Sequence, residues 1–416
     1  MIFKKKIINF ESESLSIKTW RRFKHNKVAM FGLIMIFFSC LISILGYLIT
    51  SDQTPYCNDQ KPELHIKYPG FKTKHLLVSH KEIFNNDGFF KLMLFGKEDK
   101  YINYPFFDYH FKGANIIIEE YTGNTPNNGS LITFNLASVV YNIDKKHPII
   151  YDSIQQTLCF YKINQTNKTT QSIKEIKSIL RSKNIIEKTY LLGTDLLGRD
   201  LLSRLIIGTR ISLGVGLISV IISILIGVFL GSVAGYYRGK IDNLIMWLIN
   251  VVWSIPTLLL VIAITLVLGK GVMQVFIAVG LTMWVEVARI VRGQILSIRE
   301  KEYVEAGRAL GYKNKRIIFK HILPNVIGPV VVIAASNFAS AILMEAGLSF
   351  LGIGAQPPVP SWGEMTNAHH GYILMDKAYL AFIPGLAIMI LVLSFMLVGN
   401  GLRDALDTKI SDDKAI

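Results

Sequence analysis

Long apolar runs, separated by polar stretches, dominate the pattern along this chain of 416 residues. About 20 residues of helix cross the hydrocarbon core of a membrane, so each run of that length predicts a spanning helix. The runs interpreted as spans cover residues 28–49, 211–234, 244–268, 272–290, 326–344 and 380–398. The pattern therefore predicts an all-α integral membrane protein with six transmembrane helices.

The third apolar run contains Pro256. Proline removes a helical hydrogen bond and clashes with the preceding turn, so we expect the helix to kink or break there. Irregular backbone at membrane depth needs protein or water to satisfy its polar groups. Two interpretations remain open: the break frees carbonyl groups to line a cavity, or it only adjusts the packing of the helix.

Residues 51–190 differ from the rest of the chain, because they are polar and of mixed charge. A segment of roughly 140 residues has ordinary domain size. Its frequent Phe, Tyr and Ile argue against disorder, and the short apolar runs 116–118, 131–140 and 148–151 predict strands. We expect a folded, mixed α/β insertion between the first and second transmembrane helices.

Composition and charge agree with a membrane protein. Only 18% of residues are charged, against about 25% in soluble domains. The net charge of +15 alone is compatible with nucleic-acid binding. Much of the excess of Lys and Arg, however, lies in residues 1–27 and 289–320, beside apolar runs. That placement follows the positive-inside rule, and no nucleic-acid-binding motif is present.

The positive-inside rule also fixes a topology. It predicts cytoplasmic N- and C-termini, a cytoplasmic stretch after the fourth span, and an extracytoplasmic insertion. The long apolar run near the N-terminus, with no small-residue cleavage site after it, predicts a retained anchor. Cys57 and Cys159 both fall in the insertion, where a disulfide and two free thiols are equally compatible with the sequence.

The basic stretch after the fourth span holds a short helix pattern. Glu302, Glu305 and Ala306 are three and four residues apart and share one side of a helical turn. Gly311 suits a left-handed stop, and Pro324 suits the start of the fifth span. Such a helix either lets another protein's backbone approach closely or rests on anionic lipid. The residues alone favour neither.

The same stretch resembles a known motif. Its pattern is Glu-Ala-(Ala/Gly), three residues, Gly, nine residues, then a segment ending in Leu-Pro. It is similar to the cytoplasmic motif of the binding-protein-dependent ABC importer permeases, which implies that about residues 300–323 form a coupling helix that docks on an ATPase subunit. The residues implied in coupling are Glu305, Ala306, Gly307, Gly311, Leu323 and Pro324. Gly307 stands where Ala is usual.

Further segments narrow the resemblance to the dipeptide/oligopeptide permease subfamily, in the order and spacing of its second, C-type subunit. These segments are Trp20–Lys27, Gly193–Asp200 with Ser203 and Arg204, Leu348–Gly363 and Gly401–Asp407. Thr408 replaces the usual proline. The resemblance does not extend to residues 51–190, an insertion longer than is usual in the subfamily.

The resemblance implies a type I ABC importer permease fold and a division of the chain into segments. The expected segments are a cytoplasmic arm (1–27), the first transmembrane helix (28–50), the insertion (51–190), a permease core with five further helices (191–407) and a cytoplasmic tail (408–416).

The function implied is that of a permease subunit in a bacterial inner membrane, importing short peptides by alternating access. The implied partners are a sister permease, two ATP-binding subunits, an extracytoplasmic peptide-binding protein and membrane lipid. No catalytic residue, cofactor or metal is expected, and the chain lacks a phosphate-binding Gly-x-x-x-x-Gly-Lys-Ser/Thr loop. A permease for nickel or another small solute, or for a microcin-like longer peptide, is the alternative.

Four residues are candidates for a gate or permeation path: Glu345, Pro256, Gln356 and Trp362. Acidic residues within spans are often functional, although a residue at a span end reaches interfacial water cheaply. We expect Glu286 to lie near such an end and to pair with Arg289 one turn later.

Two polar groups outside the spans have both structural and functional interpretations. Asp195, Arg199 and Asp200 are expected to form a belt that fixes the insertion to the second span; contact with a binding protein is the alternative. His369 and His370 are expected to be a solvated pair, since a metal site needs three or four ligands.

Two other functional classes fit less well. An intramembrane enzyme would need a His-Glu-x-x-His pair or a nucleophile beside a base, and neither pattern occurs. A sensor would need a cytoplasmic output domain, for which the segment after Val398 is expected to be too short.

Overall fold

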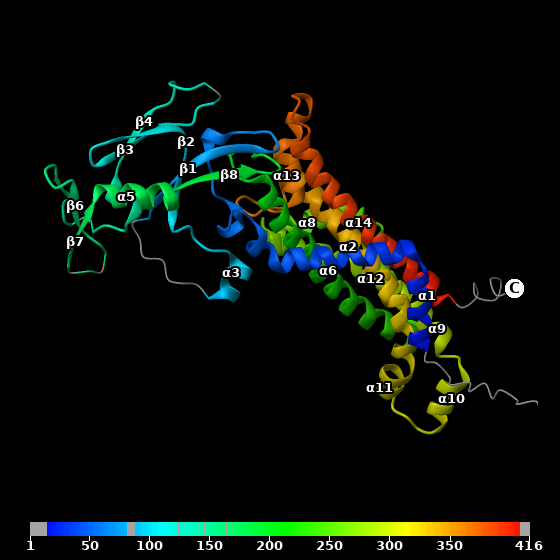
Figure 1. Cartoon of the computed structure of the whole chain (residues 1–416). Helices are drawn as coiled ribbons and strands as arrows, with labels where there is room; N and C mark the ends of the chain where they lie inside the picture. Colours follow the sequence, from blue (N-terminus) through cyan, green and yellow to red (C-terminus); the bar gives the residue numbers. More distant parts are fainter. Residues whose placement is uncertain are drawn as a thin grey trace, which may run out of the picture.

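The computed structural model describes residues 15–80, 88–123, 125–144, 146–163, 165 and 167–407. The predicted tail at 408–416 and the first half of the predicted arm lie outside these residues. Figure 1 shows a bundle of long helices with strands gathered at one end and two short helices, α10 (Glu302–Ala309) and α11 (Asn314–Arg316), at the other. We call these ends the insertion side and the α10 side.

Five helices in the described chain are long and apolar enough to cross a membrane, and a bent pair makes up to six. The five are α2 (Lys27–Ile49), α6 (Leu201–Tyr237), α9 (Val272–Ile298), α12 (Leu323–Phe350, preceded without a break by α11, Asn314–Arg316, and η4, Ile317–Ile322) and α14 (Tyr379–Leu406). A short helix, α1 (Leu15–His25), precedes α2.

The bent pair is α7 (Gly239–Trp253) and α8 (Thr257–Leu268), whose axes meet at 90°. The prediction that Pro256 breaks this helix is confirmed, because Pro256 has non-helical backbone angles (φ −53°, ψ 121°) and directly precedes α8.

Several spans are longer than their apolar runs predict. α6 begins at Leu201 rather than Ile211 because its first turns carry polar side chains that are buried in protein contacts. α9 continues past Ile290 to Ile298, with Val291 and Ile295 buried. Helices α6 and α9 pack closely because Gly227 and Gly231 leave room for α9: a Cβ at either position would lie 2.5 Å from Val287 or Ala288.

The described residues of the insertion form two antiparallel sheets. The larger has the order β4-β3-β2-β1-β8 and the smaller β5-β6-β7. Their strands are β1 (Phe71–Ser79), β2 (Tyr101–Lys112), β3 (Asn115–Glu120), β4 (Leu131–Asn135), β5 (Ile150–Asp152), β6 (Thr157–Tyr161), β7 (Lys168–Ser172) and β8 (Ile185–Tyr190). The short helices among them are α3 (Phe89–Phe95), α4 (Leu136–Val140) and α5 (Ile173–Ile179), with a π-helical turn, η3 (Leu180–Asn184).

A separate apolar core lies between the strands and helices of the insertion, with Leu76, Ile116, Leu136 and Leu158 fully buried. The run 131–140 is only partly a strand, contrary to prediction. The side chain of Asn135 accepts a hydrogen bond from the backbone N–H of Ala137 and so starts α4 at the end of β4.

Both cysteines of the insertion are free, so of the two interpretations left open the structure has the unpaired thiols. Cys57 is buried and donates to the carbonyl oxygen of Asp52 at 3.0 Å. Burial raises the pKa of the Cys57 thiol. This thiol is therefore a packed, unreactive group.

Candidate coupling and transport sites

The predicted coupling segment is a short helix, α10 (Glu302–Ala309), at the α10 side of the bundle. It faces the protein with Val304 and Gly307, which are buried, and exposes Glu305 and Ala306. Gly311 ends the segment with φ +74°, the left-handed conformation expected for a helix stop.

The spans hold α10 through an apolar cluster. Val304 packs among side chains of α6, α9, η4 and α12: Tyr236, Val287, Val291, Ile295, Ile317, Ile318, Ile322 and Val326. Leu323 lies half-buried beside this cluster, and Pro324 is exposed in the first turn of α12. Movement of α10 is therefore linked mechanically to three long helices.

Tyr236 adds a polar connection that the sequence analysis missed. Its hydroxyl donates to Asn314 Oδ1 at 2.8 Å, and its carbonyl accepts from Arg299 at 2.5 Å. Arg299 and Arg308 both lie over its ring. The sequence offered one cue to the role of Tyr236. This residue is aromatic, ends an apolar run and is followed by Tyr237 and Arg238.

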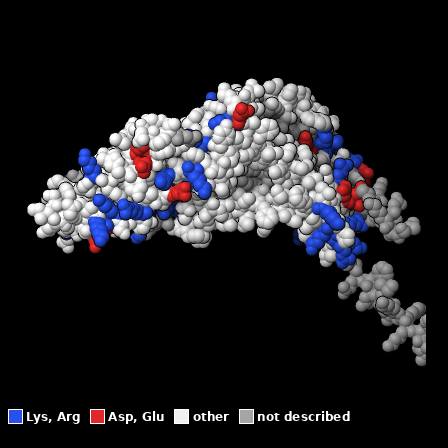
Figure 2. Space-filling view, turned by 45° about the horizontal axis from the view of Figure 1, so that its top comes forward, with Lys and Arg blue, Asp and Glu red and all other residues white. Residues whose placement is uncertain are grey.

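Exposed side chains around α10 form a mixed surface. Tyr303, Leu310 and Phe319 are exposed apolar residues, and the sequence beside Glu302 and Glu305 carries the basic residues Lys301 and Arg308. Lys and Arg gather at the end of the molecule that carries α1, α10 and α11 (Figure 2). An exposed surface with apolar and charged groups is suited to protein contact.

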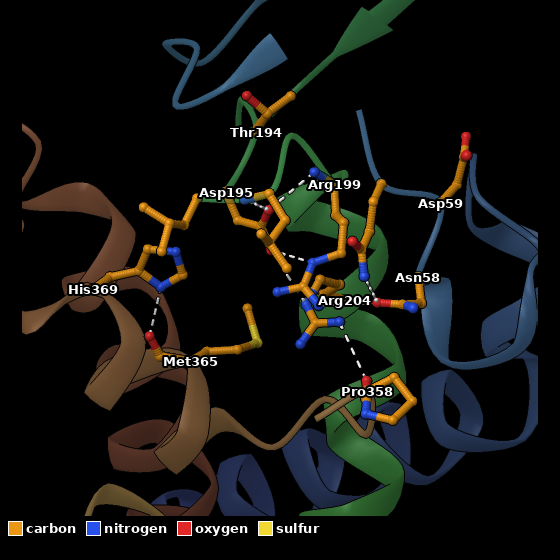
Figure 3. Close-up of polar contacts among 12 residues, drawn as sticks. Asn58, Asp59, Thr194, Asp195, Arg199, Arg204, Pro358, Met365 and His369 are labelled. Atoms are coloured by element: carbon orange, nitrogen blue, oxygen red, sulfur yellow. Dashed lines mark hydrogen bonds and ion pairs between the residues drawn. The ribbon is translucent and has the colours of Figure 1, made fainter. Parts of the chain in front are cut away.

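At the insertion side, buried charges join the second span to its surroundings (Figure 3). Asp195 lies between two arginines: its Oδ2 is 2.7 Å from Arg199 Nε and 3.6 Å from Arg204 Nε. Arg199 also donates to Asn58 Oδ1 at 3.0 Å, and Asp200 accepts from Ser51 at 2.5 Å. Asp195, Arg199 and Asp200 thus fix the start of the insertion to α6.

Arg204 extends this network to the segment before α14. It donates to the carbonyl oxygen of Pro358 and pairs with Glu364 of α13 (Trp362–His369) at 3.3 Å. Burial raises the pKa of the Glu364 carboxyl, and the charge of Arg204 opposes that rise. One buried guanidinium, 1% exposed, therefore connects α6 with α13.

The prediction of a solvated histidine pair is wrong for one member. His370 is exposed, but His369 is buried and its Nδ1 lies 2.6 Å from the carbonyl oxygen of Met365. Burial lowers the pKa of His369. The cause is α13, which turns the two neighbouring side chains to different sides.

Three of the candidate gate residues lie in packed contacts near this network. Glu345 is buried and accepts from Ser349 at 2.7 Å and Ser361 at 2.6 Å. Trp362 donates to the carbonyl oxygen of Leu205 at 2.9 Å. Gln356 donates to two carbonyl oxygens of its own turn.

The fourth candidate, Pro256, lies beside a cavity of about 70 Å³ in the spans. The cavity is lined by Val252, Trp253, Thr257, Leu260, Thr282, Met283, Val285, Glu286, Ser340 and Met344. Thr257, which follows Pro256, and Met344, which precedes Glu345, both line this cavity. The helix break after Trp253 lies next to the carboxylate of Glu286, which lines the same cavity.

The expectation that Glu286 lies near a span end and pairs with Arg289 is wrong. α9 runs from Val272 to Ile298, so Glu286 is near its middle. Arg289 stacks on the ring of Trp253 at 3.3 Å, and no ion pair joins it to Glu286 within the described residues. Glu286 is exposed on the surface of the described chain. A carboxylate there is costly if it faces lipid.

Comparison with known proteins gives two family matches. Residues 227–412 match the family described as binding-protein-dependent transport system inner membrane component. Residues 14–66 match the N-terminal transmembrane domain of oligopeptide transport permease C.

Individual relatives agree with these matches. The chain is 43% identical over 219 residues to the glutathione transport system permease protein GsiD of Pectobacterium atrosepticum, covering 53% of this chain and 72% of the relative. It is 43% identical to the dipeptide transport system permease protein DppC of Alkalihalophilus pseudofirmus, covering 52% and 71%. It is 41% identical to the oligopeptide transport system permease protein OppC of Bacillus subtilis, covering 56% and 76%.

Among solved structures, the chain is similar to an inward-facing structure of the MetNI methionine ABC transporter. The similarity has a TM-score of 0.42 and 19% identity, and it covers 50% of this chain and 98% of that one.

Proposed function

Because the chain belongs to the family of binding-protein-dependent transport system inner membrane components, we propose that it is a permease subunit of an ATP-driven importer of short peptides. Relatives at 41–43% identity are named as permeases for dipeptides, oligopeptides and glutathione. Its fold is the type I importer permease fold, with six spans and a mixed α/β insertion. Nickel and longer peptides remain alternative substrates for the uptake test.

The partners in this proposal are a sister permease, two ATP-binding subunits and an extracytoplasmic peptide-binding protein. The α10 side faces the cytoplasm, in agreement with the basic residues at that end. The insertion side faces outward. The membrane is the bacterial inner membrane.

The observation that carries the proposal is the construction of α10. Glu305 and Ala306 are exposed on a helix whose other side packs against α6, α9 and α12. An ATP-binding subunit seated on the exposed side would displace α10, and the buried cluster around Val304 would transmit the displacement to the spans. Gly311, Leu323 and Pro324 set the angle between α10 and the fifth span.

The transport pathway in this proposal runs along the face of α8 and α9 that carries Glu286. Since an exposed carboxylate within a span is disfavoured against lipid, this face meets water and the sister permease. The helix break at Pro256 opens the adjoining cavity. Glu345, Gln356 and Trp362 hold the segment between α12 and α13 against α6 and position the outer end of the pathway.

The test is uptake of a labelled panel, from dipeptides to hexapeptides plus nickel, by cells carrying the complete transporter. Glu305→Arg should reduce peptide uptake at least about tenfold at equal membrane abundance. Glu175→Arg is the matched control, because Glu175 is also an exposed acid in the first turn of a short helix, but in the insertion. Normal uptake in Glu305→Arg would reject coupling through α10. Nickel uptake without peptide uptake would reject the substrate class.

A further inference from the structure

The short helix α3 (Phe89–Phe95) exposes an unusual amount of apolar surface. Phe89, Phe90 and Phe95 are 61%, 73% and 67% exposed, Leu94 is 51% exposed, and no residue of the helix is buried. Contiguous exposed apolar surface in a folded domain commonly marks an interaction site. The neighbours of α3 indicate what covers it.

A single arginine fixes the position of α3 beside the first span. Arg210 donates to the carbonyl oxygens of Leu94 at 2.7 Å and Met93 at 2.6 Å, near the end of α3. The same guanidinium donates to the carbonyl oxygens of Ser43 at 2.6 Å and Ile44 at 3.0 Å in α2. The last carbonyl groups of α3, which have no partner inside the helix, are thereby satisfied.

These hydrogen bonds from Arg210 set the position of α3 along the axis of α2. Ser43 precedes the end of α2 at Ile49 by six residues, which corresponds to roughly 9 Å along a helix. The end of α3 therefore lies beside the span, below the last turn of α2 on the insertion side. Gly96, just after α3, is packed against the ring of Tyr47, and Arg210 lies over the same ring.

The surface next to α3 is lipid-facing in character. α2 exposes Phe37, Phe38, Leu41 and Ile44, and only 11% of its most apolar window is buried by the rest of the chain. The exposed surface of α3 continues the apolar surface of α2.

We propose that α3 lies in the interfacial layer of the membrane on the insertion side, where its phenylalanine side chains contact lipid acyl chains. An interfacial helix typically buries its apolar face about 5–10 Å into that layer. At about 100° per residue, Phe89, Phe90, Leu94 and Phe95 point in directions spread over more than half of the helix circumference. Lipid covers such a surface from all sides, whereas a protein groove usually takes one stripe of a helix. The insertion is thus anchored to the bilayer as well as to the spans.

The test measures the surroundings of position 90 in the complete transporter, reconstituted in lipid nanodiscs. A nitroxide label is attached to Phe90→Cys in a Cys40→Ser, Cys159→Ser background; Cys57 stays because it is buried. Collisions with oxygen, which enters lipid, are compared with collisions with a water-soluble nickel chelate. Phe37→Cys in α2 is the lipid reference, and Ile154→Cys, 93% exposed in the insertion, is the water reference.

We expect position 90 to match position 37, with an oxygen-to-nickel collision ratio at least about fivefold above that of position 154. A ratio equal to that of position 154 would overturn the proposal. Low collision rates with both reagents would overturn it as well, since a protein partner would then cover α3. Arg210→Gln in the labelled chain removes the hydrogen bonds by which Arg210 joins α3 to α2. This variant should shift the ratio at position 90 towards the water reference. An unchanged ratio would refute the role of Arg210 in holding α3. No outcome depends on transport.

Discussion

Residues of α10 have separable structural and docking roles. Val304 and Gly307 face the spans, while Glu305 and Ala306 face outward. A substitution on the inner side should therefore change the stability of the helix, and one on the outer side should change contact with a partner. Gly307 tests this division, because the structure gives no conformational reason for glycine there.

Gly307→Ala should be tolerated and mildly stabilising. The added Cβ would meet only Tyr312 Cδ2, at an ordinary 3.5 Å, and alanine is favoured over glycine within helices by about 0.8–1 kcal/mol. Thermal unfolding of the purified protein should rise slightly, and peptide uptake should be unchanged. A loss of uptake in a protein of unchanged stability would contradict the division between the inner and outer sides of α10.

Glu286 should be required for transport through its charge. Glu286→Gln keeps the size of the side chain and removes the carboxylate, so we expect peptide uptake to fall at least about tenfold while membrane abundance stays normal. Glu175→Gln in the insertion is the control. If Glu286→Gln transports like the native protein, the face of α9 that carries it is not a charged pathway.

The elements show which structural features the sequence can predict. The apolar runs locate the five spanning helices of the described chain and the bent pair, because membrane thickness imposes a minimum length on each, and Pro256 locates the break. The runs do not give helix ends, since α9 continues through Arg289 and Arg292 by packing on α6 and pairing Arg292 with Asp242 at 2.6 Å. Tertiary contacts of this kind leave no periodic pattern.

Some site residues could be predicted from the sequence and others could not, again because tertiary contacts leave no local pattern. A local motif predicts α10 and its stop at Gly311, whereas contacts between distant segments, such as Tyr236 with Asn314, have no local pattern. The sequence groups Glu345 and Trp362 with Pro256 as gate candidates, but it does not predict their contacts: Glu345 accepts from Ser361, Trp362 donates to Leu205, and Pro256 lies beside a cavity.

The buried side chain of His75, in strand β1, should make the stability of the insertion depend on pH. Burial lowers the pKa of His75 to about 3, so the folded domain holds this side chain neutral while the unfolded chain protonates it near pH 6.5. Between these values the unfolded state binds more protons, and stability falls as pH falls, by at most about 1.4 kcal/mol per pH unit.

The measurement is thermal unfolding of the insertion at pH 7 and pH 5, followed by a fluorophore on Cys159 in a Cys40→Ser background. The midpoint should drop at pH 5, and the drop should shrink in His75→Gln, which cannot take up the proton. Equal drops in both proteins would assign the pH dependence to other groups.

At the scale of the whole molecule, contacts at each end of the bundle join α6 to neighbouring elements. The cluster around Val304 connects α10 to α6, α9 and α12. The Asp195–Arg204–Glu364 network connects the opposite end of α6 to α13 and the insertion. α6 contributes to both, so a displacement at α10 has a continuous route through the spans to the insertion side.

The most direct test of the central claim is whether α10 touches an ATP-binding subunit. A photo-activated cross-linker is attached to Ala306→Cys in the Cys40→Ser, Cys159→Ser background of the complete transporter, with Ile154→Cys as the control on the insertion side. The account predicts an adduct between position 306 and an ATP-binding subunit, and none from position 154. Absence of that adduct in a preparation that hydrolyses ATP would contradict coupling through α10.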